Sequence, residues 1–342
     1  MPDLSSPQDS EHDRPRAVPP LVVPPLVSVV IASYNMARYL PDAIHSALAQ
    51  SYSPVEIHVV DDGSTDETER VMETFAGNPQ IFYHRQKNGG QSRAKNRGIR
   101  ESRGPFVAFL DADDMWSPDK LELQIPLFQD APRVGVVYTD FQCIDAAGTY
   151  LPTTRPVYHS GAISGKLLIK NFVTGMTSVV RRECFDAVGA FDEDLPMSVD
   201  YDLWLRISTK YEFRVLDRVT YYYRQWPGQM SHNLEGRFSC AVRIMRRFID
   251  GNPGLVDPAT VAEAWAHTYV GRGESIRVLD RRPLNALAFY ARALRQQPRY
   301  LPAWKGVAKL VLPWLANDRR RIEVHTVART GRPDHENGRA SS

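Results

Sequence analysis

Short, nearly continuous apolar runs alternate with segments of helical periodicity through roughly the first two thirds of the chain. The runs are rich in β-branched residues and occupy positions 27–32, 55–60, 106–110 and 134–138. Strands buried on both faces of a parallel sheet have this composition. Between the first two runs, Leu40, Ile44 and Leu48 recur at helical spacing. The alternation predicts βαβ units, and hence an α/β fold with a doubly wound, mostly parallel sheet flanked by helices.

A helix start is predicted after the second apolar run. Residues 64–67 read Ser-Thr-Asp-Glu, the pattern of a capping box. Val71 and Phe75 follow at a spacing that places both on one helical face. The second crossover of the sheet should therefore be a helix that begins at this box.

The pattern changes near Leu234, and from there it is helical. Residues 259–279 and 284–296 are amphipathic, and Pro298, Pro302 and Pro313 interrupt the end. Residues 284–294 resemble one helix of a tetratricopeptide repeat, but a single copy is not an array. Packing against the main domain is the expected role, with a partner surface as the alternative. We divide the chain into a disordered leader (1–25), an α/β domain (26–233), a helical C-terminal region (234–316) and a disordered tail (317–342).

Composition and charge exclude several classes of protein. The formal net charge of +2 is too small to indicate nucleic acid as a partner. Cys143, Cys184 and Cys240 lack metal-ligand or redox spacing, and their odd number fits structural thiols in a reducing compartment. No stretch approaches the ~20 apolar residues that span a bilayer. The acidic, proline-rich N-terminus does not have the pattern of a signal peptide. These features predict a cytoplasmic protein.

Polar clusters directly follow three of the predicted strands. They are Ser33-Tyr34-Asn35, Asp61-Asp62-Gly63-Ser64 and Asp111-Ala112-Asp113-Asp114. Ligands of open α/β sheets bind outside the carboxyl ends of the strands, so neighbouring strands would bring these clusters into one crevice. One acidic turn alone is more often a solvated loop or a helix cap. Three at successive strand ends indicate a site.

Asp111 and Asp113 leave their strand with one residue between them, so both carboxylates can converge on a hard cation. Mg²⁺ or Mn²⁺ needs only one or two protein carboxylates when phosphate oxygens and water complete the octahedron. A carboxylate cluster repels a diphosphate unless a metal lies between them. Arg93, Lys95 and Arg97 in the segment 88–98 are candidates for further phosphate neutralisation, or else form a solvated helix face.

The chain resembles the family 2 glycosyltransferases of the GT-A fold. The resemblance rests on VSVVIASYNMARYL, VEIHVVDDGSTDET, NGGQSRAKNRGIRESRGPFVAFLDADD, TSVVRRECFDAVGAFDEDL and VDYDLWLRIS, in the order and spacing of that family. It covers roughly residues 27–231 and implies that the domain 26–233 is a nucleotide-sugar transferase domain with a GT-A-type sheet and a C-terminal helical extension.

The resemblance implies roles for particular residues. Tyr34 and Asp62 would contact the nucleotide base, and Asp61 with the loop Ser33 to Asn35 would contact base or ribose. Arg93 would contact the diphosphate. Asp111 and Ala112 lie where the family binds ribose and donor sugar. The divalent metal, Mn²⁺ or Mg²⁺, would be held by Asp113, with Asp111 as a less direct ligand.

The same resemblance implies that Asp200, at the start of a helix, is the general base of an inverting transfer. It would accept the proton of the acceptor hydroxyl as that oxygen attacks the anomeric carbon. The alternative is that Asp200 only caps its helix. Asp202, two residues on, is expected to cap the helix rather than act as the base.

Two positions depart from the family pattern. Val199 stands where a glutamate usually precedes the base, and Trp226 stands where a late histidine lies near the metal. His232 is a candidate substitute for that histidine, and Trp226 a candidate platform for an acceptor sugar. Metal binding would then rest on Asp113, water and the diphosphate, and should be weak before the donor binds.

The implied function is transfer from a nucleotide diphosphate sugar, with UDP- or dTDP-sugars favoured, to a glycan or lipid-linked acceptor in cell-surface polysaccharide synthesis. A lipid-linked acceptor would bring the protein to the inner membrane face without embedding it. The enzymatic alternative, a sugar-nucleotide pyrophosphorylase, needs a Gly- and Arg-rich loop after the first strand, and Ser33-Tyr34-Asn35 is not one. The non-enzymatic alternative is a degenerate domain that serves as a binding or scaffold module. Donor, acceptor, linkage and oligomeric state are not encoded in a readable pattern.

Overall fold

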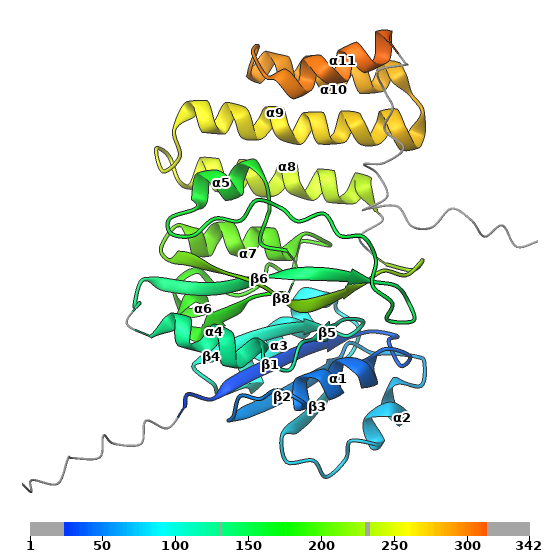
Figure 1. The fold of residues 1–342 in the computed structure, drawn as a ribbon, viewed down its shortest axis with the longest axis vertical. Helices are drawn as coiled ribbons and strands as arrows, with labels where there is room; N and C mark the ends of the chain where they lie inside the picture. The colour runs from blue at the N-terminus through cyan, green and yellow to red at the C-terminus, as the bar shows by residue number, and fades with distance from the viewer. Residues whose placement is uncertain (1–23, 130, 175, 230–232, 313–342) are drawn as a thin grey trace, which may run out of the picture.

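The fold is built on one mixed sheet of eight strands. The structure, a computed structural model, describes residues 24–129, 131–174, 176–229 and 233–312. The strand order is β3-β2-β1-β4-β7-β6-β8-β5 (Figure 1). The strands are β1 (Val27–Ser33), β2 (Val55–Asp61), β3 (Ile81–Arg85), β4 (Phe106–Asp111), β5 (Met115–Trp116), β6 (Val134–Ile144), β7 (Val179–Arg181) and β8 (Glu212–Arg224).

The predicted α/β class and mostly parallel sheet are confirmed. β1 pairs in parallel with β2 and β4, β2 with β3, and β6 with β8, whereas β7 runs antiparallel between β4 and β6. All four predicted strands are present, and each is almost wholly buried. The sequence pattern did not predict β3 or β8, because both leave many side chains partly exposed and so lack a continuous apolar run.

Helices connect the strands and form the C-terminal region. They are α1 (Leu40–Leu48), α2 (Thr68–Glu73), α3 (Gln91–Glu101), α4 (Lys120–Gln124), α5 (Ser164–Ile169), α6 (Arg182–Val188), α7 (Val199–Ser208), α8 (Leu234–Gly251), α9 (Pro258–Ser275), α10 (Pro283–Gln296) and α11 (Leu301–Val311). A 3-10 turn (Ile125–Phe128) follows α4, and a π-helical turn (Ile276–Asp280) follows α9.

The predicted capping box at residues 64–67 is wrong in detail. Helix α2 begins at Thr68, and its first turn is capped by Asp66, whose Oδ1 accepts from the Thr68 N–H at 3.1 Å. The Asp66 Oδ2 accepts from the Ala37 N–H at 2.9 Å. The Asp66 carboxylate thus connects the loop that contains Ala37 to the first turn of α2. With this tertiary contact, the helix begins later than the predicted box.

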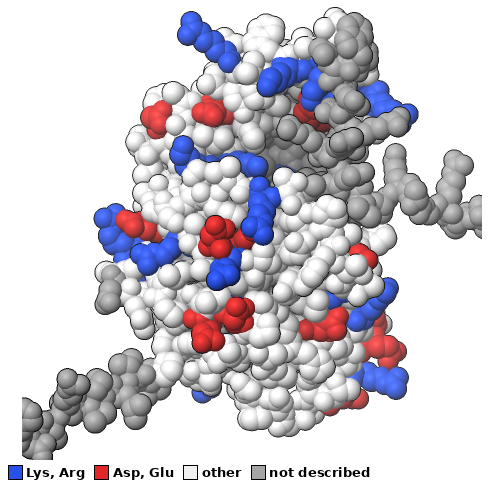
Figure 2. All heavy atoms as spheres, viewed as in Figure 1, with Lys and Arg blue, Asp and Glu red and all other residues white. Residues whose placement is uncertain are grey.

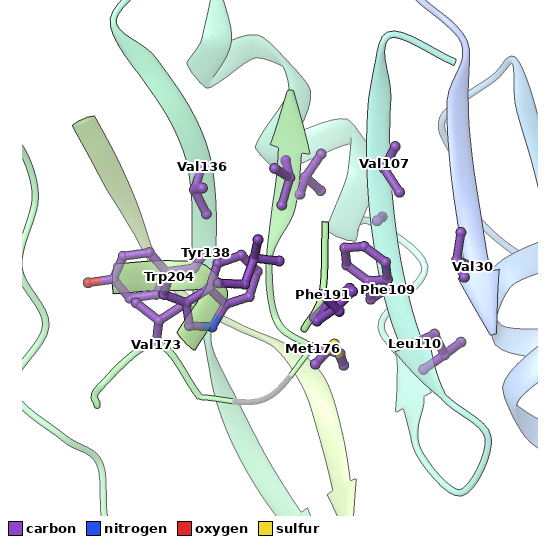
Figure 3. Close-up of a cluster of buried hydrophobic side chains, with 14 of the residues drawn as sticks. Val30, Val107, Phe109, Leu110, Val136, Tyr138, Val173, Met176, Phe191 and Trp204 are labelled. Carbon is purple, nitrogen blue, oxygen red and sulfur yellow. The ribbon is translucent and has the colours of Figure 1, made fainter. Parts of the chain in front are cut away.

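One large apolar cluster fills the space between the sheet and its helices. Phe109 of β4 contacts Phe191 edge to face, with ring centroids 5.1 Å apart (Figure 3). Trp204 of α7 and Tyr138 of β6 lie in the same fully buried core. All three cysteines are buried free thiols, as predicted.

The C-terminal helices stack beyond α7, as Figure 1 shows. Helix α8 belongs to the main core, since its Ile244, Met245 and Phe248 are buried in the large cluster. Helices α9, α10 and α11 enclose smaller clusters of their own, around Tyr290 and Ala303. Helix α11 was not predicted: Pro302 interrupts no helix but stands in its first turn, where a missing N–H costs nothing.

No helix in the described part of the chain has both the length and the apolar content to cross a bilayer. Residues 1–23 of the predicted leader and the whole predicted tail lie outside the described residues.

Gly98 sets how closely α3 approaches β1. A Cβ at Gly98 would fall 3.0 Å from Cγ2 of Val30 and still closer to Cγ1. We expect Gly98→Ala to destabilise the fold by about 1–3 kcal/mol through overpacking, despite the better helix propensity of alanine. Gly271→Ala in α9 is the matched control, because its Cβ would meet nothing within 4 Å. Urea unfolding should show a loss for Gly98→Ala and none for Gly271→Ala; equal effects would contradict this account.

Candidate functional site

Three strands end side by side and carry the polar clusters to one edge of the sheet. Ser33 of β1 is in register with Asp61 of β2, and Ala32 is in register with Asp111 of β4. The carboxyl ends of parallel strands point the same way, so the residues that follow them converge. The structure thus brings together the three clusters that the sequence predicted to meet.

The turn after β1 exposes one aromatic ring. Tyr34 is 46% exposed, whereas Ser33 is buried and its hydroxyl has no hydrogen-bond partner. Asn35 adopts φ of 54°, a left-handed conformation that asparagine tolerates better than most residues. Its Oδ1 accepts from the Thr65 N–H at 2.8 Å, and its own N–H donates to Ser64 Oγ at 2.9 Å. The loops after β1 and β2 are therefore held together while Tyr34 stays accessible.

Asp62 organises the glycine loop that precedes α3. Its Oδ1 accepts from the Gly89 N–H at 2.9 Å and from Gln86 Nε2 at 2.8 Å. Its Oδ2 accepts from the Gly90 N–H at 2.7 Å. A carboxylate has about four acceptor positions, so one remains for a ligand N–H. This geometry permits a contact between Asp62 and the nucleotide base, and that contact stays a prediction.

Asp61 is fully buried, and both of its carboxylate oxygens are engaged within the chain. Oδ1 accepts from the Ser64 N–H and Oδ2 from the Tyr83 hydroxyl, each at 2.8 Å. Its side chain therefore shapes the loop after β2. A contact of Asp61 with base or ribose stays a prediction.

Lys95 of α3 pairs with a carboxylate of the acidic turn after β4. Its side chain is 3% exposed, and its Nζ lies 3.1 Å from Asp111 Oδ1. Arg93 instead points to the surface and pairs with Glu193 at 3.1 Å. The structure therefore places Lys95 beside the acidic turn, whereas Arg93 pairs with Glu193; the contact of Arg93 with the diphosphate stays a prediction.

Asp113 accepts a hydrogen bond from Trp226, the residue at the position where the family resemblance implies a histidine. Trp226 Nε1 donates to Asp113 Oδ2 at 2.8 Å, and Gln229 Nε2 lies 3.5 Å from the same oxygen. Burial, followed by the charge of Asp111, raises the pKa of Asp113 above its ordinary value. An indole N–H only donates, so Trp226 has no lone pair for a metal. His232 lies outside the described residues.

Asp114 and Arg224 form a buried clamp behind the acidic turn. Asp114 accepts from the Tyr221 hydroxyl at 2.6 Å and from the Arg224 N–H at 2.7 Å. The Arg224 side chain donates to the Asp113 carbonyl at 2.8 Å and pairs with Asp42 at 2.9 Å. The sequence analysis missed this role for Arg224. Tyr221 and Arg224 lie 107 and 110 positions from Asp114 in the chain. Local sequence patterns do not reveal contacts at such a separation.

Asp200 lies in the first turn of α7. The N-cap residue is Ser198, in a left-handed conformation with φ of 57°, so the reading of Asp200 as a simple N-cap is wrong. The carboxylate is half-buried, and Asn171 Nδ2 lies 3.4 Å from its Oδ2. Burial raises the pKa of Asp200, against the opposing effects of the Tyr201 N–H and of the nearby charges of Lys95 and Arg237. Lys95 therefore lies near both Asp111 and Asp200.

Asp202 is neither a cap nor a free carboxylate, which corrects the expectation that it caps α7. Its Oδ2 pairs with Arg206 at 2.8 Å, and its Oδ1 pairs with Arg247 of α8. The side chain is almost wholly buried. Asp202 thus joins the α7 helix to α8 of the C-terminal region.

Asn96 joins α3 to the segment before α7. Its Nδ2 donates to the Phe191 carbonyl and its Oδ1 accepts from the Phe191 N–H, both at 2.9 Å. Lys95 on the same helix is thereby set at a fixed position relative to Asp200. The sequence analysis missed this contact, although Asn96 stands in the segment 88–98 that it singled out.

The described residues contain no group of three or more His, Cys, Asp or Glu side chains able to hold a metal ion. Asp111 and Asp113 fit the lesser demand of a cation whose remaining ligands are diphosphate and water. Burial, followed by the charge of Asp111, raises the pKa of Asp113, and a divalent cation would stabilise the ionised carboxylate against both effects. One Asp113 oxygen accepts the Trp226 N–H, so the other oxygen is the one that a cation would use.

The chain is similar in sequence to glycosyltransferases. An uncharacterized glycosyltransferase of Rickettsia typhi is 37% identical over 192 residues, which are 54% of this chain and 60% of that protein. A chondroitin synthase of Escherichia coli is 30% identical over 57% of this chain and 28% of that protein. The chain thus spans less than two thirds of the length of either relative.

The fold is similar to that of Staphylococcus aureus TarS 1–349 in complex with UDP-GlcNAc, with a TM-score of 0.62 and 19% identity over 84% of this chain and 89% of that chain. The predicted GT-A-type fold is confirmed by this similarity. The family model described as glycosyl transferase family 2 matches residues 28–189, which include β1, β2, β4 and their polar turns. This part of the chain is therefore a glycosyl transferase family 2 domain.

Proposed function

We propose that the protein transfers a sugar, with inversion, from a nucleotide diphosphate sugar to a hydroxyl of a glycan or lipid-linked acceptor in cell-surface polysaccharide synthesis. The observation that carries this proposal is the acidic turn of Asp111 and Asp113 after β4 beside the buried Lys95, whose charge also acts on Asp200. TarS was solved with UDP-GlcNAc, which supports a UDP-sugar as the first donor to test.

The donor would bind along the strand ends. Tyr34 offers an exposed ring for stacking against the base, and Asp62 keeps one acceptor position for a base N–H. Lys95 would transfer part of its pairing from Asp111 to the diphosphate. A charge-assisted contact of this kind stabilises the leaving group as negative charge develops.

A divalent cation at Asp113, with Asp111 beside it, would supply Lewis-acid stabilisation of the diphosphate when it is bound. The oxygen of Asp113 that lies away from Trp226 is the better placed of the two for this role, because the other accepts the indole N–H. Affinity for the cation should be low without the donor, since few protein ligands are at hand.

Asp200 would act as the general base. In the reaction, the acceptor oxygen forms the new bond to the anomeric carbon, the bond from that carbon to the diphosphate breaks, and the acceptor proton passes to Asp200. The raised pKa of Asp200 makes it a stronger base than an ordinary aspartate.

The test is a thermal-shift screen of UDP-, dTDP- and GDP-sugars with Mn²⁺, followed by donor hydrolysis. At least one donor should raise the melting temperature, by an amount that grows with its concentration. The same donor should be hydrolysed faster with metal than with chelator. If no nucleotide sugar shifts the melting temperature, the donor assignment fails.

The Trp226–Asp113 bond is the observation that favours a non-catalytic module, because it engages the carboxylate predicted to bind the metal. Such a module would show no donor hydrolysis under any metal condition. The turnover measured in the hydrolysis assay therefore separates the two functions.

Lys95→Gln should lower kcat/KM for the donor by roughly 10- to 100-fold, as expected for a charge-assisted contact of about 1.5–3 kcal/mol. The reason is the loss of the buried ammonium that lies beside Asp111. Arg93→Gln is the matched control, because Arg93 is exposed and pairs with Glu193. Steady-state kinetics should show a small effect for Arg93→Gln. A larger effect for Arg93→Gln than for Lys95→Gln would restore Arg93 as the diphosphate ligand.

A further inference from the structure

The last two helices carry a strong local excess of positive charge. Residues 276–312 contain eight Lys and Arg residues and one acidic residue, Asp280, which gives a net charge of +7. The rest of the chain has 34 basic and 39 acidic residues, a net charge of −5. The net charge of the whole chain is therefore small although residues 276–312 are strongly basic. Six of the eight basic side chains are exposed, namely those of Arg281, Arg282, Arg292, Arg295, Arg299 and Lys305.

The same helices expose large apolar side chains. Half of the ten large hydrophobic residues that are exposed in the described ranges lie here: Leu284, Leu287, Leu301, Trp304 and Val311. Leu284 is 79% and Trp304 52% exposed. In α10, exposed Leu284, Leu287, Ala288 and Ala291 follow the i, i+3, i+4, i+7 spacing of one helical face.

These exposed faces are not the faces that hold the helices to the protein. Ala286, Tyr290 and Ala293 of α10 and Ala303 of α11 are buried against neighbouring helices. Figure 1 shows α10 and α11 running across the end of the molecule remote from β2 and β3. In Figure 2 several blue Lys and Arg side chains lie at this end, and others lie along the middle and lower parts of the same face. The exposed apolar face of α10 thus continues into Arg295, and exposed apolar and basic side chains also lie on α11 at the same end of the protein.

The charge decides which partner suits this surface. A second copy would bring one +7 surface against another, which is unfavourable. A nucleic acid would match the charge but offers no apolar phase for exposed leucines. An anionic bilayer satisfies both features, because basic side chains meet the headgroups while Leu and Trp enter the interface.

We propose that α10 and α11 form a docking surface for an anionic phospholipid bilayer, with Leu284, Leu287, Leu301 and Trp304 inserted and the surrounding arginines on the headgroups. The surface is separate from the strand-end site, so docking holds the protein at the membrane without taking part in sugar transfer. It gives a physical basis for peripheral attachment.

The test is co-sedimentation of the full chain with phosphatidylcholine vesicles, with and without phosphatidylglycerol. We expect binding to the anionic vesicles only, weakened by salt. Arg292→Gln with Arg295→Gln should weaken binding by roughly fivefold for each charge removed. Leu301→Ser with Trp304→Ser should also weaken it. Tyr150→Ser with Val157→Ser is the matched control, because these residues are equally exposed but belong to the α/β domain.

Three results would overturn the proposal: equal binding to neutral and anionic vesicles, equal loss in the control variant, or a dimer in light scattering that Leu301→Ser with Trp304→Ser dissociates. Melting temperatures will show whether each variant is folded. Donor hydrolysis in solution should be unchanged in all of them, so failure of the docking proposal is distinguishable from failure of the proposed function.

Discussion

Asp200→Asn should abolish most sugar transfer while leaving donor binding intact. A positioned general base contributes roughly 10²- to 10⁴-fold, and kcat should fall by that amount. The fold should be preserved, because the partners of the Asp200 side chain within the described residues are Asn171 at 3.4 Å and the Tyr201 N–H, and the amide has the same shape. The measurement is the steady-state rate of transfer to acceptor, beside the donor-induced thermal shift.

The pH dependence of the wild-type protein follows from the same residue. The reaction needs the ionised carboxylate, so the rate falls as the pH drops through the pKa of Asp200. Burial raises that pKa, so the acidic fall should begin at a higher pH than an ordinary aspartate would give. In Asp200→Asn the remaining activity should lose this acidic limb.

Asp194→Asn is the matched control, since Asp194 belongs to the same acidic segment but is exposed. It should retain wild-type rates and the wild-type pH profile. If Asp200→Asn transfers sugar at the wild-type rate, Asp200 is not the base. If instead it loses donor binding together with transfer, its role is structural.

Asp113→Asn should remove the metal dependence of donor binding and lower donor turnover by roughly 100-fold or more, since a bound cation supplies several kcal/mol at the transition state. The ligand-free variant should also melt at a higher temperature than the wild type. A carboxyl whose pKa is raised in the folded protein destabilises it at a pH above that pKa, and the amide has no such charge. Calorimetry with and without Mn²⁺ and donor measures both effects.

Trp226→Phe provides the contrasting variant. It removes the N–H that bonds to Asp113 Oδ2 but leaves the carboxylate in place. We expect it to keep the metal response and to bind the cation more tightly, because both oxygens become available. If Asp113→Asn keeps the wild-type metal response, the cation is bound elsewhere or is not needed.

The local sequence was sufficient to predict four of the eight strands of the sheet, β1, β2, β4 and β6. The four apolar runs are strands because each is buried on both faces, and only such strands need a continuous hydrophobic composition. The strands β3 and β8 were not predicted because their side chains face partly exposed surroundings. The three polar turns were placed correctly, since the end of a strand is marked by the change in composition itself.

Contacts between segments far apart in the chain determined which partners the charged residues of the site have. The segment 88–98 offers several cations, and only the packing of α3 turns Lys95 inward to Asp111 while Arg93 pairs with Glu193. Likewise, Asp200 and Asp202 are both acidic residues of one helix. Asp202 pairs with Arg206 of its own helix, and only the tertiary structure adds Arg247 of α8 as its second partner.

The acidic turn after β4 shows most clearly which features the local sequence determines and which the tertiary structure determines. The sequence by itself determined that Asp111 and Asp113 follow a buried strand, because strand burial is a local pattern of residues. Only the tertiary structure decided that Asp111 pairs with Lys95, that Asp113 accepts a bond from Trp226, and that Arg224 holds the turn from behind. The physical reason is that a side chain's partner depends on which residues the fold brings within hydrogen-bond distance, and these lie far away in the chain.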